Sequence, residues 1–519
     1  MKLKKSYFIL AILVVFSLIK VDYRLDEIPY GLEVDDAEYY YNAATIGLDF
    51  DLDFANQMEG VENRFLNKEI KKIVPFHPIG SGILGAPFVF FGDLFSPLST
   101  DENLISSVYF GYSLASIFYF LLSIRFIQIS LKNLGINYDN FLLILMTFGT
   151  GIGYYAFDRF SMSHVYELFA TSFLIYISSV VASKPREISN SWILFSIGFL
   201  IYLFLAIRWV NYFLFLVPAL IFYISGINIK KIYTNLYFIS GNFFGLIIFL
   251  LHTKYLYGIY TLNQKSVVFS VESSFQENYT RFFEIEMFFE NILFVLKSMS
   301  VILFSQEFGL IYFAPILFAS LIFFLIFLIN RRFVLSLFLF FIYIFPIFSI
   351  IVIQNTAFSY GFRYLFALIP INIILYFKFF ANNQALRIYM YGASFLGFLL
   401  YLFFETSQGT SLSSEYLTNS FGFRTRYSSP DYLSNLPEAL ISVNSYLHII
   451  FTSFLGVTII KLINLVMDPV QFFSNVTEVN SEILDLIGSS ISFSWIKLLI
   501  LYAVISCLTY IVLKNRTKK

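Results

Sequence analysis

The sequence contains few charged residues and almost no cysteine. Charged residues make up 13% of its 519 residues, about half of the roughly 25% that is usual in soluble domains. The single cysteine, Cys507, excludes an intramolecular disulfide and a thiolate metal site. Basic and acidic residues are equal in number, at 34 each, so the overall charge does not favour nucleic acid as a partner. The sequence also lacks a P-loop, a serine-nucleophile elbow and an HExxH zinc motif.

Long hydrophobic runs are present instead. Hydrophobic residues make up 58% of the chain and the mean hydropathy is +0.74. Short polar breaks separate runs that are long enough to cross a bilayer. This pattern predicts an all-α, polytopic helical membrane protein with about 13 transmembrane helices. The predicted spans lie near residues 6–21, 104–125, 140–157, 164–182, 191–207, 210–226, 234–252, 309–329, 333–353, 363–380, 388–404, 441–465 and 493–513.

Basic residues between the runs predict the orientation. They fall in alternate loops, which indicates that these loops are cytoplasmic. The first run follows three lysines and has no small-residue cleavage site after it, so we expect a retained span with a cytoplasmic N-terminus. Thirteen spans leave the basic segment from Lys514 to Lys519 outside, against the usual tendency. The basic residues that fall in these alternate loops are Arg125, Lys132, Lys184, Arg186, Lys230, Lys231, Arg331 and Arg332.

The long polar segments then fall on the outer face of a bacterial inner membrane or a plasma membrane. We expect a transmembrane module over residues 1–404, with outer loops at 22–103 and 254–308. Residues 405–519 are expected to form a further outer loop and the C-terminal membrane helices. Apolar segments at 36–48 and 79–95 within the first loop predict interfacial helices, and the apolar segment at 291–304 within the second predicts an interfacial or re-entrant helix.

Two adjacent acids follow the first span, in Val34-Asp35-Asp36-Ala37-Glu38-Tyr39. On a helix, neighbouring side chains point roughly 100° apart, so one acid faces a site while the other supports it. A carboxylate near a membrane surface and aromatic rings tends to have a raised pKa, which suits a general base. The alternative is that Asp35 and Asp36 cap the helix that follows, because acids are favoured in a first turn.

Histidines and arginines gather on the same predicted side. His77 lies in Pro75-Phe76-His77-Pro78-Ile79-Gly80, and His164 ends Ser161-Met162-Ser163-His164. Arg159, Arg208 and Arg363 lie near the outer ends of spans. The planar guanidinium offers paired donors to a phosphate, so these arginines predict an anionic ligand. For each arginine alone, the alternative is an extended side chain that reaches the lipid headgroups.

A further acid, Glu307, stands in Ser305-Gln306-Glu307-Phe308-Gly309-Leu310 just before a span. It is expected to touch an acceptor or position a loop, or to cap the helix that follows. No two of the four histidines, which include His252 and His448, have the i,i+3 or i,i+4 spacing of a metal site. The sequence predicts no metal site but leaves open whether a divalent cation assists.

In the order of these motifs, the chain resembles the GT-C superfamily of integral-membrane glycosyltransferases. The motifs are Val34-Asp35-Asp36-Ala37-Glu38-Tyr39, Phe76-His77-Pro78-Ile79-Gly80, Ser161-Met162-Ser163-His164, Arg208-Trp209, Ser305-Gln306-Glu307-Phe308-Gly309-Leu310 and Ser359-Tyr360-Gly361-Phe362-Arg363-Tyr364.

The resemblance implies a sugar donor linked to polyprenyl phosphate, transfer on the non-cytoplasmic face and inversion at the anomeric carbon. It implies a catalytic base at Asp35 or Asp36. Arg363 and Arg208 would hold the donor phosphate, with help from Arg159 or His164. We expect His77, Glu307 and Tyr39 to position the acceptor or a loop.

The acceptor is then a glycan, a lipid or a protein, and the partners are membrane lipids and not nucleic acid. No nucleotide or other cofactor is implied, because the donor is already activated. The main alternative is a transporter or flippase of a lipid-linked or anionic solute, which would use the same arginines. A polymerase or ligase of lipid-linked glycans would share the topology.

Overall fold

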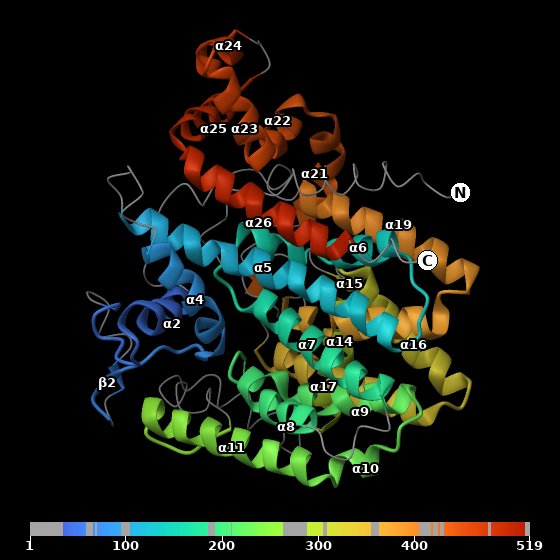
Figure 1. The fold of residues 1–519 in the computed structure, drawn as a ribbon. Helices are drawn as coiled ribbons and strands as arrows, with labels where there is room; N and C mark the ends of the chain where they lie inside the picture. Colours follow the sequence, from blue (N-terminus) through green and yellow to red (C-terminus); the bar gives the residue numbers. More distant parts are fainter. Residues whose placement is uncertain are drawn as a thin grey trace.

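The protein folds as a bundle of α-helices with two very short β-hairpins (Figure 1). The helices follow from the apolar runs, since a backbone without water must satisfy its polar groups within the helix. The computed structural model describes residues 35–58, 66–67, 70–94, 104–184, 192–208, 210–262, 288–304, 309–353, 363–403, 417–418, 424–425, 430–475 and 479–513.

The first described elements form a small layer at one end of the bundle, on the left of Figure 1. Helix α2 (Asp35–Ala44) continues into a π-helical turn, η2 (Thr45–Asp49), and packs against α4 (Gly80–Leu94). Between them, β1 (Leu66–Asn67) pairs antiparallel with β2 (Lys72–Ile73). The predicted helices at 36–48 and 79–95 are confirmed as helices. Nine of the ten residues of α2 are buried within the protein, so α2 does not lie as a half-exposed helix on a surface.

The bundle itself is built from longer helices and a few short helical turns. One large hydrophobic cluster runs through it. The elements are α5 (Leu104–Asn133), α6 (Asn140–Phe148), η4 (Tyr154–Asp158), α7 (His164–Ser183), α8 (Trp192–Leu205), η6 (Asn211–Leu216), α9 (Val217–Ile224), α10 (Ile229–Tyr233), α11 (Leu236–Tyr257), α14 (Phe288–Phe304), α15 (Leu310–Phe313), α16 (Pro315–Ile329), α17 (Phe333–Ile353), η9 (Arg363–Leu368), α18 (Ile369–Leu375), η10 (Tyr376–Phe380) and α19 (Gln384–Leu402).

Six helices in the described part of the chain are long and apolar enough to cross a membrane. This agrees with a helical membrane protein. Several other predicted spans correspond to shorter apolar helices, and residues 6–21 lie outside the described residues. The count of thirteen therefore stays a prediction. The six helices are Ser107–Asn133, His164–Ser183, Leu236–Tyr257, Arg363–Phe380, Gln384–Leu402 and Trp495–Val512.

Five predicted spans are not single continuous α-helices. The run at 309–329 is α15 and α16, which are separated at Ala314, and the run at 363–380 is the 3-10 helix η9, the helix α18 and the π-helix η10. The run at 140–157 is α6, a turn and η4, and the run at 210–226 begins as the 3-10 helix η6. The run at 441–465 is two helices, α22 (Val443–Phe451) and α23 (Phe454–Ile463). Between them, the hydroxyl of Ser453 accepts a hydrogen bond from the Gly456 N–H and starts the second helix.

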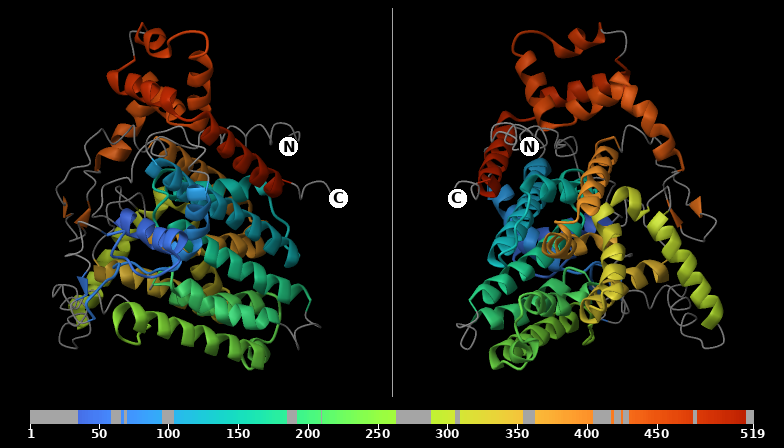
Figure 2. Two further views of the ribbon diagram at one scale, coloured as in Figure 1. Left: turned by 60° about the vertical axis from the view of Figure 1, so that its left-hand side comes forward. Right: turned by 90° about the vertical axis from the view of Figure 1, so that its right-hand side faces the viewer.

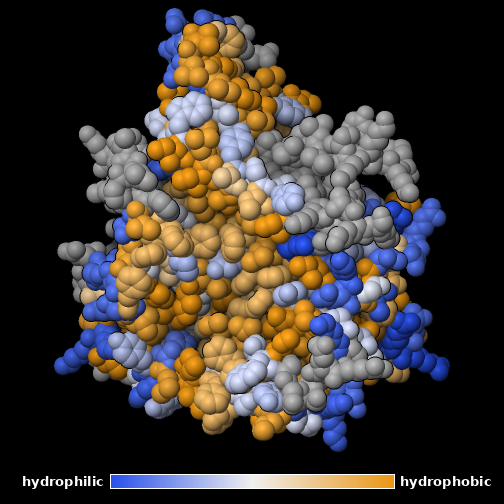
Figure 3. Space-filling view, viewed as in Figure 1, coloured by the Kyte–Doolittle hydropathy of each residue, from blue (hydrophilic) through white to orange (hydrophobic). Residues whose placement is uncertain are grey.

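The C-terminal helices form a lobe that stands beside the bundle (Figure 2). It has a small hydrophobic cluster of its own, around Phe451, Ile460, Ile483 and Ile487. Hydrophobic residues form a band down the middle of the face in Figure 3, with hydrophilic residues at its left and right margins, and the band continues onto the lobe. The remaining elements are β3 (Leu417–Thr418), β4 (Arg424–Thr425), α21 (Pro430–Ile441), α24 (Pro469–Ser474), α25 (Ser481–Ser492) and α26 (Trp495–Leu513).

Candidate functional site

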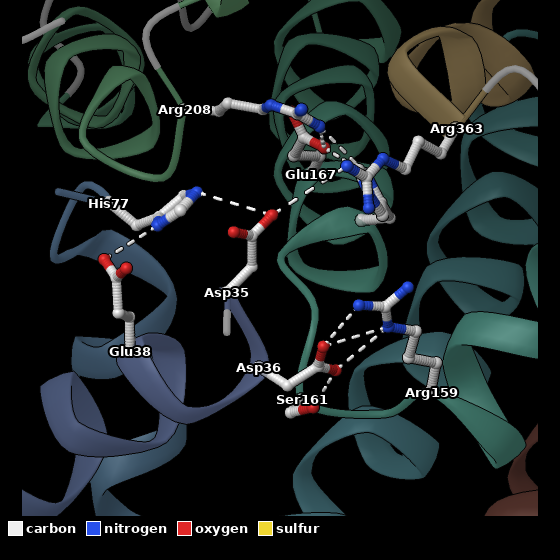
Figure 4. Close-up of polar contacts among 10 residues, drawn as sticks. Asp35, Asp36, Glu38, His77, Arg159, Ser161, Glu167, Arg208 and Arg363 are labelled. Atoms are coloured by element: carbon white, nitrogen blue, oxygen red, sulfur yellow. Dashed lines mark hydrogen bonds and ion pairs between the residues drawn. The ribbon is translucent and has the colours of Figure 1, made fainter. Parts of the chain in front are cut away.

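Polar side chains from five separate segments meet where α2 begins (Figure 4). The first turn of α2 faces the segment before α4, the segment that leads into α7, the turn after α8 and the start of η9. These segments lie far apart in the sequence, and each contributes at least one charged or ionisable side chain. Most of these side chains are buried, so their charges must be balanced locally.

Asp35 lies at the centre of this site. Its Oδ2 atom is 3.8 Å from Nε2 of His77 and 3.9 Å from Nη2 of Arg363. The Asp35 side chain is 41% exposed, whereas that of Arg363 is only 4% exposed. The structure thus presents one accessible carboxylate between a histidine and a buried arginine, at distances longer than direct hydrogen bonds.

Asp36 points the other way and is fully buried. Its carboxylate accepts hydrogen bonds from Nε of Arg159, at 3.0 and 3.1 Å, and from Nη2 of Arg159 at 2.5 Å. The hydroxyl of Ser161 donates to the same carboxylate at 2.6 Å. This closed ion pair joins α2 to the segment before α7.

Glu38 holds the histidine beside Asp35. Its Oε2 atom lies 2.9 Å from Nδ1 of His77 and accepts the backbone N–H of Phe76 at 3.0 Å. With Nδ1 directed at Glu38, Nε2 of His77 is left to face Asp35. The ring of Tyr39 lies 4.7 Å from the imidazole, between ring centres. Burial raises the pKa of Tyr39, so its hydroxyl is neutral and is not a base at neutral pH.

A second buried cluster joins α7 to the turn after α8. Oε2 of Glu167 lies 2.9 Å from Nδ1 of His164 and 3.2 Å from Nη1 of Arg208. Nη1 of Arg208 is also 3.0 Å from Nδ1 of His164. Because a ring nitrogen either donates or accepts, Nδ1 serves Glu167 when it is protonated and Arg208 when it is not. Burial alone lowers the pKa of Arg208, but the Glu167 carboxylate together with Tyr364 and Tyr39 outweighs this effect and raises the pKa overall.

An aromatic ring connects the two buried arginines. The guanidinium carbon of Arg208 lies 4.1 Å from the ring centre of Tyr364, and that of Arg363 lies 5.3 Å from it. Both contacts fall within the range of cation–π attraction. The ring therefore holds two permanent positive charges close together beside Asp35, an arrangement that suits an anion with more than one oxygen.

The backbone fixes the distance between the His77 segment and the Arg208 segment. The N–H of Gly80 donates to the carbonyl of Ala206 at 2.8 Å. A Cβ atom on Gly80 would lie 2.5 Å from the backbone of Ala206, so only glycine permits this approach.

An apolar groove of about 410 Å³ opens beside this contact. It runs between α4, α8 and α11, and Ile79 and Ala206 form part of its lining. Its other lining residues are mainly aromatic and aliphatic, with Asp51 and His252 as ionisable members. The groove thus lies next to segments that carry His77 and Arg208.

The predicted site residues come together in part. Asp35, His77 and Arg363 share one cluster, His164 and Arg208 share another, and Tyr39 packs on His77. Asp36 and Arg159 pair with each other. Glu307 lies outside the described residues.

Sequence reasoning missed four residues of the site: Glu38, Ser161, Glu167 and Tyr364. Glu167 carried a signal, because it follows His164 by three residues and therefore shares its helix face. Glu38 carried one too, three residues after Asp35. Among the described residues, no group of three His, Cys, Asp or Glu side chains is arranged to hold a metal ion.

No protein-family model, no curated protein and no solved structure matches the chain. A proposed function must therefore rest on the arrangement of the site.

Proposed function

We propose that the protein is a membrane glycosyltransferase that moves a sugar from polyprenyl phosphate to an acceptor hydroxyl, with inversion. The observation that carries the proposal is the setting of Asp35. This accessible carboxylate stands between His77 and Arg363, with a second buried arginine behind. The motif resemblance to GT-C enzymes motivates the choice of donor and the arrangement of about thirteen spans.

Asp35 acts as the general base in this proposal. The acceptor oxygen attacks the anomeric carbon while its proton passes to the Asp35 carboxylate. The bond from the acceptor oxygen to the anomeric carbon forms as the bond from that carbon to the phosphate oxygen breaks. The electron pair of the broken bond leaves with polyprenyl phosphate. Asp36 does not share this role, because its oxygens are engaged by Arg159 and Ser161.

Arg363 and Arg208 stabilise the negative charge that grows on the departing phosphate. Both side chains are buried, at 3% and 7% exposed, so water screens their charges little. Glu167 and His164 hold Arg208 in place. Arg159 supports the site through Asp36 and does not hold the donor.

The apolar groove supports a lipid-linked donor. Lipid chains bind in clefts lined by hydrophobic side chains, with a few polar groups at one end. Ala206 and Ile79, which form part of the groove lining, are two residues in sequence from Arg208 and from His77. With the phosphate at the arginines, this groove is the apolar surface that we propose for the first part of the polyprenyl chain.

The test uses the purified full-length protein in detergent, a radiolabelled polyprenyl-phosphate sugar and a membrane extract as the source of acceptors. We expect labelled product and free polyprenyl phosphate from the wild type, and neither from the Asp35→Asn variant. Asp93→Asn is the matched control, because it makes the same change at an exposed acid at the end of α4.

Two results would contradict the proposal. One is equal turnover by the wild type and the Asp35→Asn variant. The other is movement of the intact labelled lipid across sealed vesicles without any chemical product, which would identify a transporter.

A further inference from the structure

The C-terminal lobe has a feature that the proposed chemistry does not use. The chain interrupts an apolar stretch at Thr452 and Ser453, both of which are buried. The two helices on either side, α22 and α23, have nine and ten residues. At 1.5 Å per residue each is about 14–15 Å long, roughly half the thickness of the hydrocarbon core. Neither helix can cross a bilayer alone.

Side-chain contacts show that α23 runs antiparallel to α26. The ring of Phe454, at the start of α23, lies 4.6 Å from that of Tyr502. The ammonium group of Lys461, near its end, lies 5.1 Å from the ring of Trp495, where α26 begins. Tyr502 is seven residues into α26, or about 10 Å along the helix. The start of α23 therefore lies about 10 Å farther along α26, counted from the first residue of α26, than the end of α23 does.

The start of α22 lies at an outer end of the bundle. The ring of Tyr446, in the first turn of α22, is 5.4 Å from that of Phe403, which follows the end of α19. The basic-loop orientation puts this end of α19 on the outer face. The chain thus enters along α22 from the outer side, turns at Thr452 and Ser453, and returns along α23.

Helix α26 runs in the same direction as α5, beside which it lies (Figure 1). Phe493, just before α26, has its ring 6.4 Å from that of Phe110 near the start of α5. Helix α5 leads from the predicted outer face to its last turn, which contains Lys132 and is predicted to lie on the cytoplasmic side. The end of α26 therefore lies on the cytoplasmic side.

We propose that α22 and α23 form a re-entrant hairpin that enters the outer half of the bilayer and returns to the outer face. The chain then crosses the membrane twelve times, one fewer than the thirteen predicted. This places the basic residues that follow α26 in the cytoplasm and removes the conflict with the positive-inside tendency. The inference depends on the predicted orientation and not on the glycosyltransferase proposal.

The surface of α23 fits lipid as its partner. Leu455, Ile459 and Leu462 form a stripe along one helix face, at 37%, 38% and 53% exposed. The segment after α23, where the hairpin reaches the outer surface, exposes Leu465 and Val466 at 71% and 81%. This apolar stripe runs from the depth of Tyr502 to the level of Trp495, which is the depth range of the outer leaflet.

Side-chain hydroxyls bind backbone polar groups at the turn between α22 and α23. The hydroxyl of Thr452 donates to the carbonyl of His448 at 2.7 Å, and that of Ser453 donates to the carbonyl of Ile450 at 2.5 Å. Ser453 also accepts the N–H of Gly456 at 3.1 Å. Non-helical backbone at membrane depth persists only when its polar groups find such partners.

The test measures the side of the membrane on which two segments lie. In the full-length Cys507→Ala background, single cysteines replace Asn464 or Ser474, which are exposed polar positions between α23 and α25. We expect both to react with a membrane-impermeant maleimide on intact cells. A fluorescent protein that matures only in the cytoplasm, fused after Lys519, should fluoresce.

A single crossing by residues 441–465 predicts the reverse for both measurements. Labelling of Asn464→Cys and Ser474→Cys only after permeabilisation would therefore overturn the proposal. So would a dark C-terminal fusion accompanied by an active fusion of alkaline phosphatase, which works only outside. If a cysteine proves unreactive, the C-terminal fusion alone still distinguishes the re-entrant hairpin from a single crossing.

A spin label tests contact with lipid. A nitroxide at Leu455→Cys should collide with oxygen, which concentrates in the bilayer, and not with a water-soluble nickel complex. The matched label at Asn464→Cys should show the opposite preference. Equal access of the nickel complex to both positions would mean that the lobe stands in water, and the hairpin proposal would fail.

Discussion

Two adjacent acids have opposite surroundings in this protein. Asp36 is fully buried and is bound by Arg159 and Ser161 at distances of 2.5–3.1 Å. Asp35 is 41% exposed, and the basic atoms of His77 and Arg363 stand 3.8 and 3.9 Å from it. The short contacts form a closed structural pair, whereas the contacts of Asp35 with His77 and Arg363 are longer than direct hydrogen bonds.

The difference arises from helix geometry. Successive side chains diverge by roughly 100° around the helix, so the same pair of residues can serve the interior and a site at once. The closed pair fixes the position and rotation of the first turn of α2. That turn in turn directs Asp35 between His77 and Arg363. The comparison teaches that Asp36 anchors the first turn of α2, whereas Asp35 is the more exposed acid of the pair and is the one to which we assign the proposed chemistry.

The largest expected effect is on activity, from Asp35→Asn. The amide cannot take the acceptor proton, so we expect the transfer rate to fall roughly a thousandfold, within the usual range for general base catalysis. The melting temperature should stay at the wild-type value, because Asp35 is partly exposed. Turnover of labelled donor and a thermal melt of the detergent-solubilised protein measure the two quantities. A large loss of stability would mean that both acids are structural.

Asp36→Asn should show the converse pattern. It leaves the Arg159 guanidinium without its carboxylate in a mostly buried position, which destabilises the protein by roughly 3 kcal/mol. We expect a clearly lowered melting temperature, with Asp93→Asn as the unchanged control. Activity measured well below the melting temperature should fall less than in Asp35→Asn. An unchanged melt would contradict the structural role of the closed pair.

Arg363→Lys should have a smaller effect on catalysis. Lysine keeps the positive charge but loses the planar fork and the contact with the ring of Tyr364, so we expect about a tenfold loss of kcat/KM for the donor. The matched control is Arg387→Lys, because Arg387 is 55% exposed and lies beside Asp139. Equal kinetics for the two variants would remove Arg363 from the phosphate site.

The smallest expected effect comes from Glu38→Gln. The amide can still accept the Phe76 N–H, but the charge beside Nδ1 of His77 is lost. Replacing a charge-assisted hydrogen bond with a neutral one costs about 1 kcal/mol, which corresponds to roughly a fivefold lower rate. The pH profile of kcat should shift as well, whereas Glu438→Gln, at an exposed position, should leave it unchanged. An unshifted profile would limit Glu38 to a packing role.

Much of the fold could be predicted because apolar runs of sufficient length become helices in any membrane protein. The run near 104–125 corresponds to α5, and the one near 164–182 to α7. Breaks were harder to predict. Thr452 and Ser453 interrupt the hydropathy of 441–465 too little to reveal the break, although their hydroxyls bind backbone groups on both sides of it.

The site was predictable as a set of residues but not as a set of contacts. Hydropathy and basic loops predicted that Asp35, His77 and Arg363 lie on one side of a membrane. They could not show which acid turns inward, because that depends on the rotation of α2. The partner of Asp36, Arg159, is 123 residues away in the sequence, and no local pattern encodes such a pairing.

The hydrogen bond from Gly80 to Ala206 should make the site sensitive to the lipid environment. It attaches the His77 segment to the end of α8, so a change in the tilt of α8 carries His77 with it. Helices tilt when the hydrocarbon thickness and their apolar length differ. Because Glu38 ties His77 to the first turn of α2, the separation of this turn from Arg363 should respond to acyl chain length. Reconstitution in short-chain and long-chain phospholipids should therefore give different turnover at equal donor concentration.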